Sequence, residues 1–163
     1  MIDDEVREAA EGLFGLLRGR KLKLVTAESC TGGLVAGALT EIPGSSEVLE
    51  RGFVTYSNAA KESVLGVSAG TIRQYGAVSA ETAEAMAIGA LKASPADVSV
   101  AITGVAGPGG GSADKPVGLV HFAASRRGGP VLKREIRFGD LGRSEVRRRS
   151  VLSAFALAAE VVA

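Results

Sequence analysis

Residues 22–33 read LKLVTAESCTGG, and this stretch decides the fold class. The run Leu22–Thr26, which includes β-branched residues, is typical of a short strand, and it stops at a turn. Gly32 and Gly33 close the turn, and the apolar run Leu34–Leu39 that follows predicts a helix. A strand, a tight turn and a helix start within about a dozen residues are typical of an α/β protein.

The sequence on either side of this unit predicts further helices and strands. Apolar residues three and four positions apart favour helices at residues 3–18, 58–65, 79–94 and 143–162, the third with Ser79 as its N-cap. Short apolar runs favour strands at residues 51–57, 98–103, 117–125 and 132–138, the last two joined as an antiparallel hairpin. We therefore expect one α/β domain over residues 1–163, an α/β/α layered fold with a mixed, mostly parallel sheet and an antiparallel hairpin.

The counts of reactive residue types narrow the chemistry. The 163 residues include one cysteine and one histidine, so the sequence favours neither a disulfide framework nor a zinc site. A Ser-His-Asp triad would have to use His121. His121 alternates with apolar residues in an expected strand, which favours a packed histidine over a catalytic one. We expect no metal and no cofactor, and a base other than histidine.

Charge and hydropathy favour a cytoplasmic protein that binds neither nucleic acid nor membrane. The formal net charge is +1, which argues against the broad basic field that nucleic-acid binding uses. The apolar stretches, such as Ala154–Ala159, are far shorter than the roughly 20 residues of a membrane span. Acidic residues stand near the N-terminus where a signal peptide would carry lysines.

The turn after the first strand is the first candidate site. A hydroxyl at a strand-to-helix junction lies beside unpaired backbone N–H groups and the positive end of the helix dipole, where an oxyanion is stabilised. Ser29 is therefore a candidate nucleophile, although Ser and Thr before a helix also serve as caps. Cys30 is a rival nucleophile, because thiolates at helix N-termini are activated, or else a small buried apolar residue.

Lys61 is the second candidate. The residues alone leave two interpretations open: a solvated lysine on a short helix, or the base of a serine nucleophile in a protein with a single imidazole. Acting as a base would require its pKa to fall from about 10.4 to about 7–8.

Residues 103–112, TGVAGPGGGS, are the third candidate. Five glycines after a buried strand suit either a loop whose amides bind an anion or a flexible surface loop. Arg143 and Arg147 lie four positions apart on the last helix, where they would clamp a phosphate or form a solvated helix start.

Taken together, these segments resemble the CinA C-terminal domain family, the nicotinamide-nucleotide amidases. The matching runs occur in the family's order and extend over essentially the whole chain: TAESCTGG at 26–33, RGFVTYSNAAK at 51–61, GAV at 76–78, ITGVAG at 102–107, KPVG at 115–118, and Arg143 with Val146-Arg147.

The resemblance implies hydrolysis of the carboxamide of nicotinamide mononucleotide to nicotinate mononucleotide and ammonia, in pyridine nucleotide salvage, by a metal-independent Ser/Lys acyl-enzyme mechanism. Ser29 would be the nucleophile and Lys61 its base, and Tyr56 and Thr103 would assist the proton relay or position the pair. Beyond the catalytic group, we expect substrate contacts, including oxyanion contacts around Cys30–Gly32 and phosphate contacts by the glycine loop and the arginines, at Cys30, Thr31, Gly32, Gly104, Ala106, Gly107, Gly111, Arg143 and Arg147.

Two other functions stay open from the sequence. The chain could be a non-catalytic module that binds a pyridine nucleotide, with Ser29 as a cap or phosphate ligand. It could also be an amidase for another small amide, with the same mechanism. Alanine-rich helices leave surface to pack, so we expect a homo-oligomer.

Overall fold

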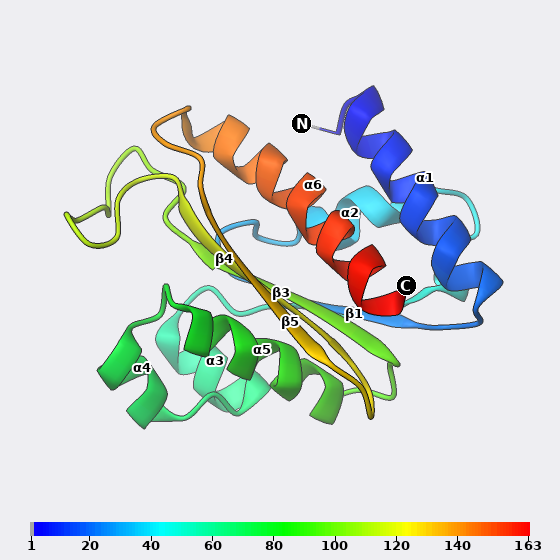
Figure 1. Ribbon diagram of the computed structural model, residues 1–163, viewed down its shortest axis with the longest axis horizontal. Coiled ribbons are helices and arrows are strands. Elements are labelled where there is room, and N and C mark those ends of the chain that lie inside the picture. The colour runs from blue at the N-terminus through cyan, green and yellow to red at the C-terminus, as the bar shows by residue number, and fades with distance from the viewer. Residues whose placement is uncertain (1) are drawn as a thin grey trace.

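The structure is a computed structural model that describes residues 2–163. One five-stranded sheet, in the order β2-β1-β3-β4-β5, runs through the molecule (Figure 1). Its strands are β1 (Leu24–Glu28), β2 (Leu49–Val54), β3 (Val98–Gly104), β4 (Leu119–Arg126) and β5 (Val131–Arg137). The helices are α1 (Asp4–Gly19), α2 (Leu34–Thr40), α3 (Asn58–Leu65), α4 (Ala69–Tyr75), α5 (Ala80–Lys92) and α6 (Arg143–Val162), with a 3₁₀ turn, η1, at Ser45–Glu47.

The sheet is mixed, as predicted. Strand β1 is parallel to both of its neighbours, β2 and β3. Strand β4 is antiparallel to both β3 and β5, and β4 and β5 form the predicted hairpin. Parallel and antiparallel pairs therefore meet at β3, the central strand of the sheet.

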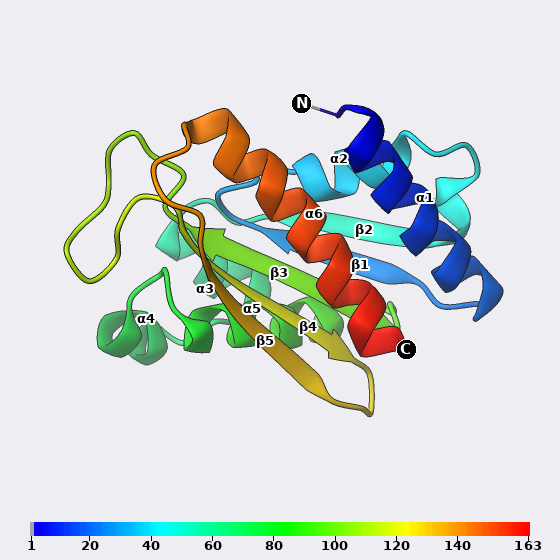
Figure 2. The same ribbon diagram turned by 45° about the horizontal axis from the view of Figure 1, so that its top comes forward.

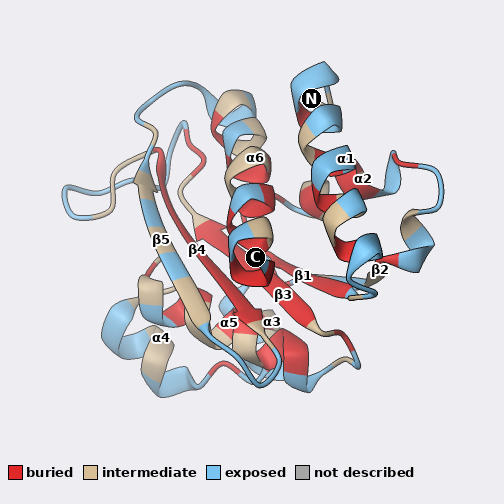
Figure 3. Ribbon diagram, turned by 45° about the vertical axis from the view of Figure 1, so that its right-hand side comes forward, coloured by how far each residue is buried: buried red, intermediate tan, exposed pale blue. Residues whose placement is uncertain are grey.

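Helices cover both faces of the sheet, which confirms the α/β/α layers. Helices α1, α2 and α6 lie on one face and α3, α4 and α5 on the other (Figure 2). Strands β1, β3 and β4 are buried almost throughout, whereas β2 and β5 at the sheet edges are more exposed (Figure 3). Alternate residues of β1 enter opposite cores: Leu24 packs with the α1 and α6 side, and Val25 and Ala27 pack with α5.

Local capping chemistry sets the helix that carries Lys61. The Ser57 hydroxyl accepts a hydrogen bond from the Ala60 N–H at the start of α3, and Gly66 ends α3 in the left-handed conformation. Gly89 of α5 lies against the carbonyl of Leu65, where a Cβ would approach that oxygen to 1.9 Å. Glycine therefore allows α3 and α5 to pack closely.

The elements differ from the sequence prediction in several places; strand β4, for example, begins at Leu119 and not at residue 117. Strand β1 begins and ends two residues later than predicted, because its register is set by pairing with β2 and β3 along Leu24–Glu28. Strand β2 occupies Leu49–Val54 rather than residues 51–57. Helix α4 was not predicted: it buries no residue fully, so it lacks an apolar stripe, and the Ser68 cap is its main sequence signal. Of the helices within residues 2–163, none is long and apolar enough to cross a membrane.

Candidate functional site

The candidate site lies where the parallel strands β1 and β3 end side by side. In open α/β sheets, ligands bind in the crevice outside the carboxyl ends of parallel strands. A pocket of about 290 Å³ opens there, formed by the turn after β1, the start of α3, the segment before α5, the loop after β3 and the start of α6. Its lining residues are Ser29, Cys30, Tyr56, Asn58, Lys61, Ala77, Val78, Thr103, Gly104, Val105, Ala106, Gly107, Gly109, Gly110 and Arg143.

Most of the predicted site residues meet in this pocket. Four of them do not line it: Thr31, Gly32, Gly111 and Arg147. Three lining residues were not predicted as site residues, namely Asn58, Ala77 and Val78, and three more, Val105, Gly109 and Gly110, belong to the candidate loop 103–112 but were not named individually. The sequence motifs that resemble the family contain each of these except Gly109 and Gly110, so those motifs were the available signal.

Ser29 and Lys61 form a buried pair at the floor of the pocket. The Lys61 side chain is 1% exposed, and its Nζ lies 3.0 Å from Ser29 Oγ. The other partners of Nζ are two backbone carbonyls, that of Thr55 at 2.8 Å and that of Tyr56 at 3.5 Å. A neutral amine has two N–H groups and one lone pair. An ammonium would donate to all three partners, whereas the neutral amine would donate to the two carbonyls and accept the Ser29 hydroxyl proton, so these partners accommodate Lys61 in both protonation states.

Burial lowers the pKa of the Lys61 side chain below its usual value. Removing an ammonium from water disfavours the charged form, and the hydroxyl and carbonyls around Nζ carry no full charge to compensate. The shift is in the direction that a lysine base requires.

The thiol of Cys30 has the opposite electrostatics. Cys30 is buried in the core formed with α1, α2 and α6, and burial raises its pKa to about 12. A thiolate is therefore scarce at neutral pH, and the thiol behaves as the small buried apolar group that was the alternative interpretation. Within one turn, the geometry favours Ser29 over Cys30 as nucleophile.

Tyr56 and Thr103 lie at the pocket, but their hydroxyls have other partners. The Tyr56 hydroxyl accepts a hydrogen bond from Nη2 of Arg143 at 2.8 Å, and the Tyr56 side chain is exposed. The buried Thr103 hydroxyl donates to the carbonyl of Ala77 at 2.8 Å. These contacts fit a positioning role for both residues better than a direct proton relay.

The two candidate arginines of α6, Arg143 and Arg147, contact different parts of the structure. Nη1 of Arg143 donates to the Gly107 carbonyl at 2.8 Å, which keeps Arg143 at the mouth of the pocket. Arg147 donates to the carbonyls of Cys30 and Thr31 at 3.1 and 3.3 Å. The expectation that both clamp one phosphate does not match this geometry: Arg147 braces the turn after β1 instead.

Close packing leaves no room for a side chain at three glycines, Gly104 at the end of β3 and Gly107 and Gly111 in the loop that follows. A Cβ at Gly104 would lie 2.7 Å from Val120, and one at Gly107, whose φ is +83°, would lie 2.6 Å from Val117. A Cβ at Gly111 would lie 2.8 Å from the Val117 nitrogen. The absence of side chains lets this loop fold back onto the segment before β4, with Ala106, Gly107, Gly109 and Gly110 against the pocket.

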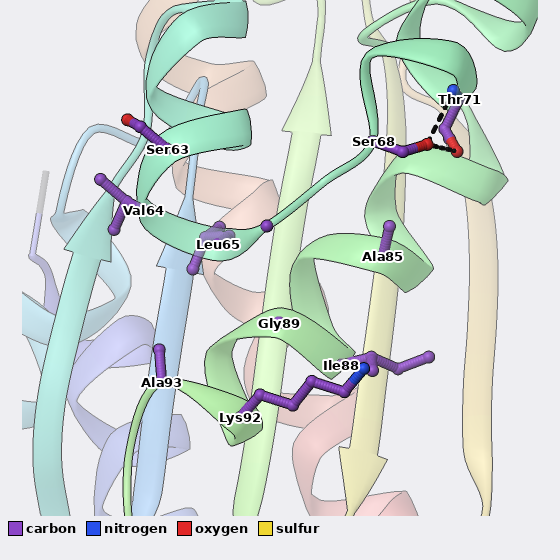
Figure 4. Close-up of a pocket in the computed structure, with 11 residues that line it drawn as sticks. Ser63, Val64, Leu65, Ser68, Thr71, Ala85, Ile88, Gly89, Lys92 and Ala93 are labelled. Atoms are coloured by element: carbon purple, nitrogen blue, oxygen red, sulfur yellow. Dashed lines mark hydrogen bonds between the residues drawn. The ribbon is translucent and has the colours of Figure 1, made fainter.

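A larger hollow and the single histidine lie outside the pocket that holds Ser29 and Lys61. A larger hollow of about 580 Å³ lies between α3, α4 and α5, and its single titratable lining residue is Lys92 (Figure 4). His121 lies opposite Thr103 on β4, is buried and does not line the pocket of Ser29, and burial lowers its pKa. Within residues 2–163, no cluster of three or more His, Cys, Asp or Glu side chains is arranged to hold a metal ion.

Fold and site together define a class of protein: an α/β domain with a buried serine–lysine pair under a strand-to-helix turn, next to a glycine-rich loop. The model of the CinA C-terminal domain matches residues 6–162, and the chain belongs to this family. The family suggested by the sequence motifs is therefore confirmed.

Relatives and solved structures agree with this assignment. The chain is 51% identical over 158 residues to the nicotinamide-nucleotide amidohydrolase PncC of Escherichia coli strain K12, covering 96% of this chain and 93% of the relative. The crystal structure of competence/damage inducible protein CihA from Agrobacterium tumefaciens superposes with a TM-score of 0.97 at 52% identity, covering 99% and 98% of the two chains. A CinA superfamily protein from Klebsiella pneumoniae gives a TM-score of 0.91 at 36% identity, covering 96% and 97%.

Proposed function

We propose that this chain is an amidohydrolase that converts nicotinamide mononucleotide to nicotinate mononucleotide and ammonia, with Ser29 as nucleophile and Lys61 as its base. The observation that carries the proposal is the 3.0 Å contact between Ser29 Oγ and the buried Nζ of Lys61. The substrate follows from the name of the E. coli relative, which matches nearly the whole chain at 51% identity.

The reaction proceeds through an acyl-enzyme. Neutral Lys61 accepts the Ser29 proton while Oγ bonds to the amide carbon, and the carbonyl oxygen becomes an oxyanion. The C–N bond then breaks, and the Lys61 ammonium returns the proton to the leaving nitrogen, so that ammonia departs. Water then attacks the ester carbon and gives a proton to Lys61, the bond between that carbon and Ser29 Oγ breaks, and the Lys61 ammonium returns the proton to Oγ, so that nicotinate mononucleotide leaves and Ser29 and neutral Lys61 are restored. The carbonyls of Thr55 and Tyr56 hold Nζ in place through both halves of the cycle.

Backbone N–H groups of the turn are the oxyanion donors. Within the described chain, residues 2–163, the N–H groups of Cys30 and Thr31 have no oxygen acceptor, whereas the Gly32 N–H already donates to the Ser29 carbonyl. The donor set expected from the sequence, Cys30–Gly32, therefore narrows to Cys30 and Thr31. Donors fixed before the reaction stabilise the developing charge without reorganisation.

The ribose phosphate binds at the mouth of the pocket. Arg143 is exposed there and is held by the Gly107 carbonyl and the Tyr56 hydroxyl. The neighbouring backbone of Gly109 and Gly110 carries no side chains that would block a phosphate. An arginine at this place supplies the charge that a nucleotide monophosphate requires.

A binding module without activity does not account for Lys61. Burying an amine whose pKa is lowered is unfavourable for folding, and a nucleotide sensor needs no base behind a serine. A catalytic cycle needs that base. The structure therefore favours an amidase over a module in which Ser29 is only a cap.

One assay separates the three functions. Ammonia release is measured with nicotinamide mononucleotide, nicotinamide and glutamine, with the Ser29→Ala variant as the blank. Release from the mononucleotide well above that from the other two supports the proposal. Release chiefly from another amide identifies a different amidase, and calorimetric binding of the mononucleotide without turnover identifies a binding module.

A further inference from the structure

Glu28, the last residue of β1, carries a buried carboxylate that the mechanism above does not use. Its side chain is 0% exposed and accepts four hydrogen bonds. One oxygen accepts from the Thr31 hydroxyl at 2.7 Å and the Val35 N–H at 2.9 Å. The other accepts from the Thr26 hydroxyl at 3.2 Å and the Ala36 N–H at 3.1 Å.

These contacts make Glu28 the cap of α2, delivered from the strand that precedes it. The N-cap position of α2 is Gly33, which has no side chain to bond the free N–H groups of the first turn. The Glu28 carboxylate bonds two of them, and its charge is favourable at the positive end of the helix. The Glu28 side chain therefore joins the end of β1 to the start of α2, and residues 29–33 form the loop that it closes.

The same residue is linked to Lys61 through the backbone. The Glu28 carbonyl accepts the Thr55 N–H at 2.9 Å, and the Thr55 carbonyl accepts from Lys61 Nζ at 2.8 Å. On the other side of the turn, Arg147 of α6 bonds the carbonyls of Cys30 and Thr31. Ser29 is the residue that follows Glu28, so its Oγ is placed relative to Nζ by this set of bonds.

We propose that Glu28 is the positioning residue for the nucleophile: its carboxylate anchors the turn 29–33 to α2 and thereby sets Ser29 Oγ at hydrogen-bond distance from Lys61. The catalytic part of this inference rests on the proposed function. The carboxylate also accepts the Val35 and Ala36 N–H groups at the start of α2, so these two groups do not donate to the oxyanion. The oxyanion is bound by the backbone N–H groups of Cys30 and Thr31.

The decisive variant is Glu28→Gln, which keeps the size and shape of the side chain. Each carboxylate oxygen accepts a hydrogen bond from one backbone N–H, that of Val35 or that of Ala36. A backbone N–H cannot accept a hydrogen bond, so the NH₂ group of glutamine would lose one of these two bonds in either orientation. One end of the turn is then released. A misplacement of about 1 Å lowers the rate of a positioned reaction roughly 10²-fold, so we expect kcat to fall by about 10- to 100-fold with KM changed less than about twofold.

Two readouts test Ser29 itself. The first is the split between kcat and KM for ammonia release from nicotinamide mononucleotide. The second is the rate of labelling by diisopropyl fluorophosphate, in which Ser29 Oγ displaces fluoride and Lys61 takes the proton. Labelling needs no knowledge of the substrate. Wild-type protein that labels rapidly but releases no ammonia would refute the proposed function, while the labelling rate of Glu28→Gln would still decide the role of Glu28.

Leu157→Ala is the matched control for lost stability. Leu157 is buried on α6, ten residues or about 15 Å along the helix from Arg147. This variant should lower the melting temperature and leave kcat and labelling unchanged. Slower labelling and lower kcat in Glu28→Gln, at a melting temperature no lower than that of the control, support the proposal. Wild-type labelling and kcat in Glu28→Gln, or a rise in KM alone, overturn it.

Thr31→Val keeps the test decisive if Glu28→Gln does not fold. It removes the shortest of the four bonds to the carboxylate and keeps the Thr31 N–H that the oxyanion needs. Its labelling rate and kcat should fall several-fold, with KM unchanged. Wild-type values for both in a folded Thr31→Val protein would overturn the proposal.

Discussion

Two loops follow the neighbouring parallel strands β1 and β3, and they are built in opposite ways. The turn after β1, residues 29–33, is short and held by side chains from two directions: Glu28 bonds it to α2, and Arg147 bonds its carbonyls from α6. The loop after β3, residues 105–118, is long and rich in glycine, and residues 108–114 are exposed.

Under the proposed function, this difference would let one pocket hold a nucleophile in place and admit a substrate. A nucleophile must stay within a fraction of an ångström of its base, which calls for a locked turn on rigid elements. A substrate of some size must enter and leave, which a loop with few side-chain anchors permits. Arg143 is one of those anchors, through the Gly107 carbonyl. Substitutions that remove Ser29, its base or the side-chain bonds that hold the first loop should therefore act on kcat, and those in the second loop on KM or stability.

The largest effect is expected for Ser29→Ala. Removing the nucleophile should lower kcat at least about 10⁴-fold, because the remaining site only binds and polarises the amide. The matched change in the other loop is Ser112→Ala, which removes the acceptor of the Lys115 N–H. That variant should keep near wild-type kcat. The measurement is ammonia release by the two variants, once their melting temperatures have been shown to be equal. Substantial turnover by Ser29→Ala would refute the serine mechanism.

Lys61→Met should come next, with a loss of about 10³-fold or more in kcat, because the base is gone. Its stability carries a second signature. The wild-type Lys61 pKa is lowered in the folded state, so between that value and about 10.4 the unfolded chain binds more protons and wild-type stability rises with pH. The variant lacks this term.

The free energy of unfolding of Lys61→Met, relative to wild type, should therefore be most favourable at low pH and decline as pH approaches 10. Urea unfolding between pH 6 and 10 measures it. In wild type, kcat/KM should rise with pH until Lys61 is neutral and then level off. A stability difference that does not vary with pH would show that Lys61 has an ordinary pKa in the folded protein.

The two loops also show what one sequence can predict. The turn after β1 was predicted because its glycines and hydroxyls carry the local signal, and strand-to-helix geometry then follows. The burial of Lys61 was not visible, since it depends on Gly89 of α5 meeting the Leu65 carbonyl and on how β1 and β2 pair. Such contacts join residues far apart in sequence.

Arg147 illustrates the same limit. Its spacing from Arg143 correctly placed both on one helix, but helical spacing says nothing about what lies beside each turn of that helix. In the structure the carbonyls of Cys30 and Thr31 face Arg147, and the pocket faces Arg143. The role of Glu28 was hidden for a related reason: a carboxylate in a strand gives no sign that it caps the next helix.

A smaller effect, of a different kind, is expected for Gly107→Ala in the second loop. Its φ of +83° and the approach of a Cβ to Val117 make alanine strained, so the variant should lose about 1–3 kcal/mol of stability. Displacing the carbonyl that Arg143 bonds should raise KM several-fold with little change in kcat. Gly109→Ala, where a Cβ meets nothing within 4 Å, is the control and should keep the wild-type melting temperature. Equal melting temperatures for the two variants would contradict the packing account.

The smallest effect is expected for Cys30→Ala, although Cys30 adjoins Ser29, the proposed nucleophile. Losing a buried sulfur should lower stability by about 1 kcal/mol, and kcat should stay within about twofold because the oxyanion donor at this position is the backbone N–H. Native wild-type protein should also resist iodoacetamide, since burial raises the thiol pKa to about 12. Rapid inactivation by iodoacetamide, with an inactive Cys30→Ala, would instead make the thiol the nucleophile. The contrast between Ser29 and Cys30 then identifies what makes one side chain reactive and the other inert. Both residues belong to the same turn, but Ser29 Oγ is hydrogen-bonded to Lys61, whereas Cys30 packs in the core.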